Sequence, residues 1–337
     1  MALLSVEHLT KHFRLDRSVG AALMGRPAGW IKPVEDLSFE IAPGEILGIV
    51  GESGCGKSTT CNLIAKLLEP TSGCIRFDGE DVTNLSVAAL RRYRAQVQMI
   101  FQDPFDSLNP RLRAYDLVAE SPRALRLWDE AEIARRVPAM LALVGLPPER
   151  YVQRYPHQMS GGERQRVGIA SALIAQPRLV IADEPVSMLD VSIRAGVMDL
   201  LRDLSVRLNF SCLYVSHDLS ILTHLCDRVM VMYLGQVMEV ATAHDLVNVP
   251  HHPYTRALVA AVPVPDPAYR RQTVEIKGEL AKPVNPPPGC RFAPRCHLAM
   301  PVCSTTPPMR DVADRHTVAC HAVAASNAQT SRTGAAQ

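Results

Sequence analysis

Short apolar segments alternate with longer amphipathic segments along most of the chain. The apolar segments, which have the pattern of strands buried on both faces, are residues 45–50, 97–101, 179–183, 212–216 and 228–235. Helical patterns such as those of residues 191–209 and 218–226 separate them. Because strands and helices alternate, we predict an α/β domain with a largely parallel sheet.

Three regions depart from this alternation. Residues 103–178 contain no good strand pattern and predict a helical insertion. Residues 14–33 contain Gly20, Gly25, Pro27 and Gly29, and we expect a loop there between two early strands. Prolines cluster in 263–267 and 285–289, so residues from 250 to 325 are expected to form a separate appendage, followed by a disordered tail, 326–337.

Composition narrows the class of protein. The chain has 337 residues, of which 47% are hydrophobic and 21% charged, so it can bury a large core as one or two domains. Its net charge of +2 gives no argument for a nucleic-acid partner. No uncharged apolar run is long enough to span a membrane. Glu7 and Lys11 interrupt the N-terminal stretch where a signal peptide would need apolar residues, so we expect a cytosolic chain with reduced cysteines.

The stretch GESGCGKST, residues 51–59, matches the phosphate-loop pattern, with Gly51, Gly56, Lys57 and Ser58 in register. Such glycines let backbone N–H groups surround phosphate oxygens, while the lysine reaches the outer phosphates and the serine binds Mg²⁺. The alternative is a glycine turn without a ligand. A predicted strand before the stretch and a helix after it favour the phosphate site.

A second chemical signal lies at the end of another apolar strand, in the stretch LVIADEP. Asp183 at a strand end can hold Mg²⁺ through water, and Glu184 can orient or deprotonate an attacking water. The alternative is a pair of acids that cap a helix. Together with the phosphate loop, these acids indicate a nucleotide-hydrolysing site.

The segment YPHQMSGGERQRVGIASALIAQPRLVIADEP (155–185) resembles the signature-to-acid region of ATP-binding cassette (ABC) ATPases. FQDPFDSLNPR, HPYTRALVAAVPVPDP and GCRFAPRC are similar to motifs of the ATPase subunits of bacterial oligopeptide and dipeptide importers. DEPVSMLDVSI is similar to the second of the two ATPase subunits of such importers. The resemblance covers residues 3–323. It implies a P-loop NTPase core at 1–249, with a parallel sheet, an antiparallel β subdomain and a helical subdomain at about 103–168, and an oligopeptide-transporter-type C-terminal domain at 250–325, small and Cys-rich.

The resemblance also implies roles for individual residues. Glu184 and His217 are the expected catalytic residues, and Ser58, Gln102 and Asp183 are the expected ligands of Mg²⁺. Asp190 is expected to cross a dimer interface. Phe13 is expected to stack on adenine, although an isolated aromatic there would more often be a core residue. The residues expected to bind ATP are Phe13, Gly51, Ser53, Gly54, Cys55, Gly56, Lys57, Ser58, Thr59 and Gln102.

The signature is expected to act on the nucleotide of a partner ATPase. Ser160, Gly161, Gly162 and Glu163 occupy its positions, and a serine and two glycines at a helix N-terminus offer N–H groups to a γ-phosphate. Glu163 stands where glutamine is common, and its charge is expected to repel phosphate. Met188 and Ser171 also replace frequent residues, alanine and arginine respectively. None of these departures removes a catalytic group.

The resemblance therefore implies an ABC-type ATPase that uses ATP and Mg²⁺ to drive peptide import. Its expected partners are a second ABC ATPase subunit in a heterodimer, two transmembrane permease subunits and an extracytoplasmic substrate-binding protein. The expected location is peripheral, on the cytoplasmic face of the bacterial inner membrane. Nickel, glutathione or a sugar derivative are alternative cargoes, because the ATPase subunit does not touch cargo. A soluble ABC ATPase and a non-catalytic subunit are further alternatives; Lys57, Glu184 and His217 argue against the latter.

Cys290, Cys296, Cys303 and Cys320 gather near the end of the chain. They contain no CxxC pair, which disfavours a common zinc ribbon. Tetrahedral zinc, an iron–sulfur cluster and four reduced, metal-free thiols all remain open on the residues alone. The resemblance favours a [4Fe–4S] cluster, because tails of this kind in peptide-importer ATPases are associated with one.

Overall fold

The computed structural model describes residues 2–15, 29–103, 107–262, 276–278, 284–286 and 288–323. Within these residues the strands are β1 (Leu4–Arg14), β2 (Trp30–Ile41), β3 (Ile46–Val50), β4 (Ser72–Phe77), β5 (Glu80–Asp81), β6 (Val97–Ile100), β7 (Leu179–Asp183), β8 (Ser211–Ser216), β9 (Arg228–Tyr233), β10 (Gln236–Thr242), β11 (Arg310–Ala313) and β12 (His316–Val318). The α-helices are α2 (Lys57–Ile64), α3 (Val87–Gln96), α5 (Ala114–Leu125), α6 (Glu130–Leu143), α7 (Pro148–Tyr151), α8 (Gly161–Leu173), α9 (Val191–Leu208), α10 (Leu219–Leu225), α11 (Ala243–Asn248) and α12 (Pro253–Ala261). Short 3₁₀ helices are η1 (Pro156–Gln158), η2 (Ala293–Arg295) and η3 (Pro301–Ser304).

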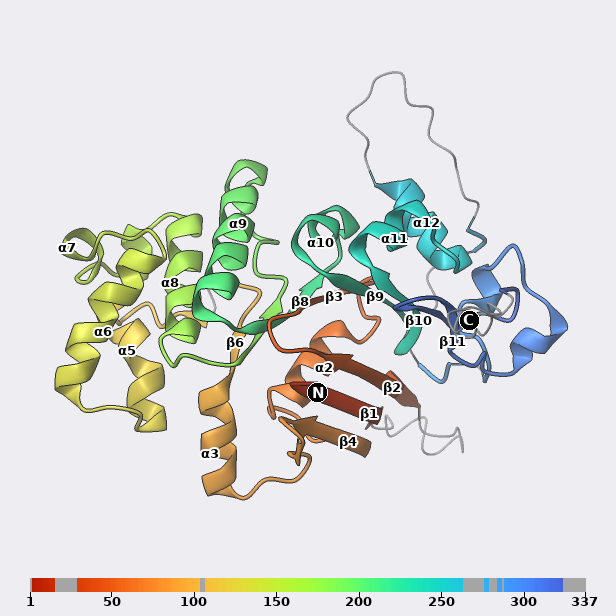
Figure 1. Cartoon of the computed structure of the whole chain (residues 1–337), viewed down its shortest axis with the longest axis horizontal. Coiled ribbons are helices and arrows are strands. Elements are labelled where there is room, and N and C mark those ends of the chain that lie inside the picture. Colours follow the sequence, from red (N-terminus) through yellow and green to blue (C-terminus); the bar gives the residue numbers. More distant parts are fainter. Residues whose placement is uncertain are drawn as a thin grey trace, which may run out of the picture.

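A central sheet has the order β11-β12-β10-β9-β3-β8-β7-β6, and its strands from β9 to β6 run parallel (Figure 1). Strand β3 lies in the middle and is buried on both faces. Its side chains alternate between two hydrophobic clusters: Ile46 and Val50 belong to one, and Leu47 and Ile49 to the other. The predicted parallel α/β sheet is therefore confirmed, and it brings several carboxyl strand ends to one edge.

A second, antiparallel sheet has the order β2-β1-β4-β5 and packs over α2 and the central sheet through the cluster that contains Leu47 and Ile49. This sheet is the antiparallel β subdomain implied by the family resemblance. The expected loop at 14–33 is shorter than predicted, because β2 already begins at Trp30, where Trp30 pairs with Arg14. Residues 16–28 lie outside the described residues.

Helices α5, α6, α7 and α8 form a group at one side of the central sheet (Figure 1). They confirm the predicted helical insertion. Ser171 on α8 donates a hydrogen bond to the carbonyl of Leu117 on α5 at 3.1 Å, so the residue that replaces the frequent arginine fastens two helices of this group.

The region after residue 250 is not separate from the core, contrary to the expected appendage. Strand β12 pairs with β10 and so extends the central sheet, while Phe292 is 1% exposed and belongs to the main core cluster. In α12, Tyr254 is fully buried and Leu258 packs on the same cluster, so this helix packs against the main core. The clustered prolines indicate where the composition of the chain changes, but long-range strand pairing decides how the region after residue 250 packs on the core. The expected disordered tail, 326–337, lies outside the described residues.

Of the helices that the structure describes, none combines the length and the apolar character that a membrane crossing requires.

Candidate functional site

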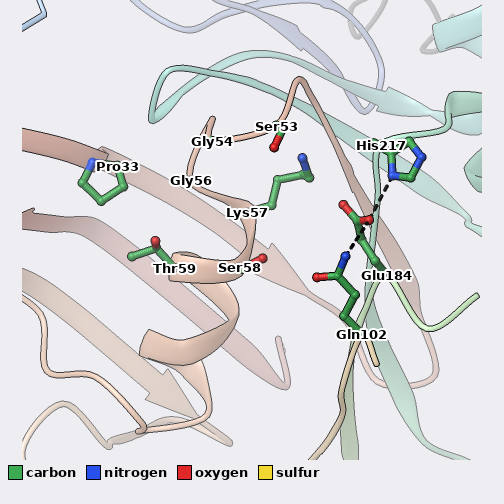
Figure 2. A pocket seen from close by; sticks show the side chains of 10 residues that line it. All are labelled: Pro33, Ser53, Gly54, Gly56, Lys57, Ser58, Thr59, Gln102, Glu184 and His217. Atoms are coloured by element: carbon green, nitrogen blue, oxygen red, sulfur yellow. Dashed lines mark hydrogen bonds and ion pairs between the residues drawn. The ribbon is translucent and has the colours of Figure 1, made fainter. Parts of the chain in front are cut away.

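A cavity of about 270 Å³ opens at the carboxyl edge of the parallel strands (Figure 2). The loop after β3, the first residue after β7 and the first residue after β8 all face it, because parallel strands end at the same edge of the sheet. The residues that line it are Pro33, Ser53, Gly54, Gly56, Lys57, Ser58, Thr59, Gln102, Glu184 and His217. The structure thus brings together predicted residues from four separate parts of the chain.

Glycines allow the loop between β3 and α2 to fold tightly. Gly56 has a φ of 110°, and a Cβ atom at this position would lie 1.8 Å from the carbonyl oxygen of Pro33. A Cβ atom at Gly51 would lie 2.2 Å from the carbonyl oxygen of Met232. Both positions therefore need glycine, one for backbone conformation and space, the other for space alone.

Lys57 is 5% exposed, and its ammonium group donates to the carbonyl oxygens of Gly51 at 2.7 Å and Glu52 at 3.2 Å. Carbonyl oxygens of the phosphate loop itself therefore hold the Lys57 ammonium group in place. Helix α2 begins at Lys57, so its N-terminal N–H groups point toward the same cavity. A buried cation and a helix N-terminus together create a site for a polyanion such as a nucleotide phosphate chain.

Asp183 ends β7 beside Ser58. Burial raises the pKa of the Asp183 carboxyl, and a hydrogen bond with Ser58 acts in the opposite direction. The Oδ1 atom of Asp183 is buried without a hydrogen-bond partner. A buried, unpartnered carboxylate oxygen next to a hydroxyl suits a hard cation, because Mg²⁺ binds oxygen ligands. The residues present therefore fit the expected Mg²⁺.

Glu184 lies between two other predicted residues. Its Oε2 atom is 2.9 Å from Nδ1 of His217 and accepts a hydrogen bond from Nε2 of Gln102 at 3.4 Å (Figure 2). Glu184 has a φ of 46°, an uncommon left-handed conformation for a residue with a side chain. Its backbone N–H donates to Val215 at 3.0 Å, which fixes this turn against β8. A carboxylate held between an imidazole and an amide can orient a water molecule.

Some predicted residues lie away from the cavity lining. Cys55 is 2% exposed, and burial raises the pKa of its thiol, so its side chain belongs to the core below the loop. Phe13 on β1 is 37% exposed and packs under the ammonium group of Lys11 at 5.2 Å. Asp190 is the N-cap residue of α9. The adenine-stacking role of Phe13 and the dimer-interface role of Asp190 remain predictions.

Ser160 and Glu163 form a capping box at the start of α8. Ser160 accepts from the Glu163 N–H at 3.3 Å, and Glu163 accepts from the Ser160 N–H at 2.7 Å. The other carboxylate oxygen of Glu163 accepts from the hydroxyl of Tyr151, and this bond is the main cause of a lowered pKa of Glu163. Gly162 needs its small size, since a Cβ atom there would lie 2.7 Å from Ile193. Both carboxylate oxygens of Glu163 therefore have partners within the chain, and its expected repulsion of a partner's phosphate remains a prediction.

Pro33 is a lining residue that sequence reasoning missed. It lies in β2, where no phosphate motif exists, and reaches the site because β2 passes beside Gly56. Only the long-range packing of the second sheet against the phosphate loop places it there, so no local signal could have identified it.

The four C-terminal cysteines are neighbours. Burial raises the pKa of the Cys290, Cys296 and Cys320 thiols, and the nearby Cys303 thiol adds to each of these three increases. In the part of the chain that the structure describes, no group of three histidine, cysteine or carboxylate side chains is arranged to hold a metal ion. Neither the expected [4Fe–4S] cluster nor the zinc alternative is therefore supported by the arrangement of the described side chains.

Comparison with known proteins agrees with this geometry. Residues 34–187 match the family described as ABC transporter, and residues 238–303 match the oligopeptide/dipeptide transporter, C-terminal region. The oligopeptide transport ATP-binding protein AppF of Bacillus subtilis is 46% identical over 95% of this chain and 97% of its own length. The chain belongs to the ABC transporter ATPases. OppF of Escherichia coli, also an oligopeptide transport ATP-binding protein, is 43% identical over 94% of this chain and 95% of its own length.

A solved structure places the fold in the same family. The ATP-binding cassette MJ0796, in a dimeric post-hydrolysis state bound to ADP and Pi, is 27% identical. It has a TM-score of 0.62 and is matched over 71% of this chain and 98% of its own. The present chain therefore carries its phosphate loop, its strand-end acids and His217 on the fold that the family shares.

Proposed function

We propose that this chain binds and hydrolyses ATP to drive the import of peptides through a membrane transporter. The observation that carries the proposal is the convergence of Lys57, Glu184 and His217 on one cavity in an ABC ATPase fold. Similarity to AppF and OppF, both named as oligopeptide transport ATP-binding proteins, supports a peptide cargo. The match of residues 238–303 to the oligopeptide/dipeptide transporter C-terminal region supports the same cargo.

In this mechanism the phosphate loop binds the phosphate chain of ATP with its backbone N–H groups, and Lys57 offsets its charge. Ser58, Asp183 and Gln102 would hold Mg²⁺, which supplies charge neutralisation when it is bound. Glu184 accepts a proton from, or orients, the water that attacks the γ-phosphorus, and the bond to the β-phosphate oxygen breaks to release ADP. His217 holds the Glu184 carboxylate in place.

The signature acts on a partner's nucleotide in this proposal. Ser160, Gly161 and Gly162 begin α8 but are absent from the residues that line the cavity of their own chain. The dimeric structure of MJ0796 bound to ADP and Pi supports pairing of two cassettes. The proposed partners are a second ABC ATPase subunit, two permease subunits that helical residues 103–160 would contact, and an extracytoplasmic substrate-binding protein. This assembly would hold the chain at the cytoplasmic face of the membrane.

An iron–sulfur cluster on Cys290, Cys296, Cys303 and Cys320 stays a proposal without a formed ligand set. The mutual proximity of the four thiols supports it, whereas binding would require the side chains to rearrange. Anaerobic purification with iron, sulfide and zinc analysis tests it. Iron and sulfide in about equal amounts would support the cluster; one zinc per chain, or neither metal, would contradict it.

The proposed ATPase role is tested with Glu184→Gln in the assembled transporter. This variant keeps the shape of the side chain but removes its basic carboxylate, so ATP binding should persist while turnover falls by a factor of about 100 or more. ATP turnover and peptide uptake into vesicles are measured together. Turnover within a few-fold of the unmodified protein would show that Glu184 does not serve the proposed role.

A further inference from the structure

Glu52, the second residue of the phosphate loop, is held by partners far away in the sequence. Its backbone N–H donates to the hydroxyl of Tyr254 at 3.1 Å. Its carboxylate forms an ion pair with Arg295, whose Nη1 atom lies 3.0 and 2.9 Å from the two oxygens. Its carbonyl accepts from Lys57. Every polar group of Glu52 therefore has a partner, although the phosphate-loop pattern leaves this position unspecified.

Arg295 belongs to the short segment 290–296, which the core fixes firmly. The rings of Phe292, Tyr233 and Tyr254 form a triangle with centroid separations of 4.9 to 5.3 Å, and all three residues are at most 1% exposed. Arg295 also donates to the hydroxyl of Tyr233 at 3.2 Å, and its side chain is 11% exposed. The guanidinium is thus held on a rigid support before any nucleotide arrives.

The same segment also supports the other end of the phosphate loop. Arg291 is 4% exposed, forms an ion pair with Glu35 and donates to the carbonyl of Leu234. The next residue, Gly235, donates its N–H to the carbonyl of Cys55 at 2.7 Å. Arg295 therefore contacts the phosphate loop directly, whereas Arg291 supports it indirectly, through the turn at Leu234 and Gly235.

We propose that segment 290–296 positions the phosphate loop for nucleotide, with Arg295 acting through its ion pair with Glu52. This inference rests on the proposed ATPase function and adds positioning residues to it. The ion pair does two things. It holds the loop in one conformation, which lowers the ordering cost of binding, and it neutralises a carboxylate that would otherwise stand one residue from the phosphate site.

The test measures ADP binding to the full-length chain, in the presence of Mg²⁺, by titration calorimetry. Arg295→Met should weaken ADP binding about tenfold, in the range expected for a coupled, partly buried ion pair. Arg295→Lys, which keeps the charge, should bind within about threefold of the unmodified chain. The double variant Arg295→Met with Glu52→Gln should recover most of the lost affinity, because no unpaired carboxylate remains.

Arg228→Met is the matched control. Arg228 forms an ion pair of 2.6 Å with Glu45 at the other end of β3, with 20% of its side chain exposed. This variant should lower the thermal midpoint while ADP affinity stays within twofold. If Arg295→Met binds ADP within twofold of the unmodified chain, or if the double variant recovers nothing, the positioning role is wrong. If the unmodified chain itself binds no ADP, the proposed function fails instead.

Discussion

The Nδ1 atom of His217 lies 2.9 Å from the Oε2 atom of Glu184, and the two residues follow the ends of neighbouring strands, β8 and β7. His217 is well exposed, with 58% of its side chain accessible, whereas only 15% of the Glu184 side chain is. The histidine therefore reaches over the carboxylate from the open side of the cavity. This contact, together with the hydrogen bond from Gln102, restrains the Glu184 carboxylate.

His217→Ala should therefore reduce turnover by a factor of about 100, because the Glu184 carboxylate loses its orienting partner. KM for ATP should change much less. Steady-state ATPase kinetics of the assembled transporter separate the two parameters. A raised KM with an unchanged kcat would contradict this role, since it would assign His217 to binding alone.

Gly56→Ala should abolish ADP binding and destabilise the chain by several kcal/mol, at roughly the scale of severe backbone strain plus a steric clash. The new Cβ atom would lie 1.8 Å from the Pro33 carbonyl, at a φ of 110°. Gly54→Ala is the control: its φ is 78°, but no atom lies within 4 Å of the added Cβ, so it should cost only about 1 kcal/mol. Urea unfolding and ADP titration of both variants check this, and equal effects would contradict it.

Glu163→Ala should lower stability by about 1 kcal/mol, because it removes half of the capping box and the Tyr151 bond. Glu163→Gln should keep the capping box and cost less.

The lowered pKa of Glu163 predicts a pH effect of definite sign. The stability that the Glu163 carboxylate contributes is present above the pKa of about 4.5 that it has in the unfolded chain. This stability is lost as the pH falls through the lower pKa of the folded chain. Thermal midpoints measured from pH 7 to pH 3 should therefore converge for the unmodified and Ala chains; a constant difference would refute the assignment.

His252 predicts a second pH effect, at higher pH. Burial lowers its pKa to about 4, and its Nδ1 atom accepts the N-cap hydrogen bond from the Tyr254 N–H at 3.0 Å. Between pH 6.5 and 4 the unfolded chain binds a proton that the folded chain does not, so stability falls as the pH falls through this window, by up to about 3 kcal/mol. His252→Asn keeps a capping acceptor without a titrating group and should flatten this part of the stability curve. A variant with the same pH dependence as the unmodified chain would contradict the prediction.

Local sequence patterns identified the central strands and the phosphate loop because each depends on neighbours in the chain. Ile46 and Val50 are apolar because the middle of a covered sheet is dry, and Gly56 is glycine because its backbone conformation requires it. The capping box of Ser160 and Glu163 also depends on near neighbours in the chain, because an S-x-x-E pattern lets the two residues bond each other's backbone N–H groups.

Long-range pairing accounts for what local patterns missed. Nothing in the residues around Pro33 reveals that Gly56 lies against it, and nothing near Val318 reveals its pairing with Glu239. The proline-rich texture after residue 250 suggested independence, whereas β11, β12 and Phe292 join that region to the core. These contacts depend on the whole fold, which periodicity cannot describe.

The separation of Glu52 and Arg295 by 243 positions has a consequence for the order of events during synthesis. Translation proceeds from the N-terminus, so the ribosome releases the phosphate loop, β3 and α2 long before it makes segment 290–296. A nascent chain that has reached residue 249 has its glycine loop and its lysine but neither arginine of that segment. Nucleotide binding should therefore mature late, when the segment that contains Arg291 and Arg295 has been made and packs against the rest of the chain.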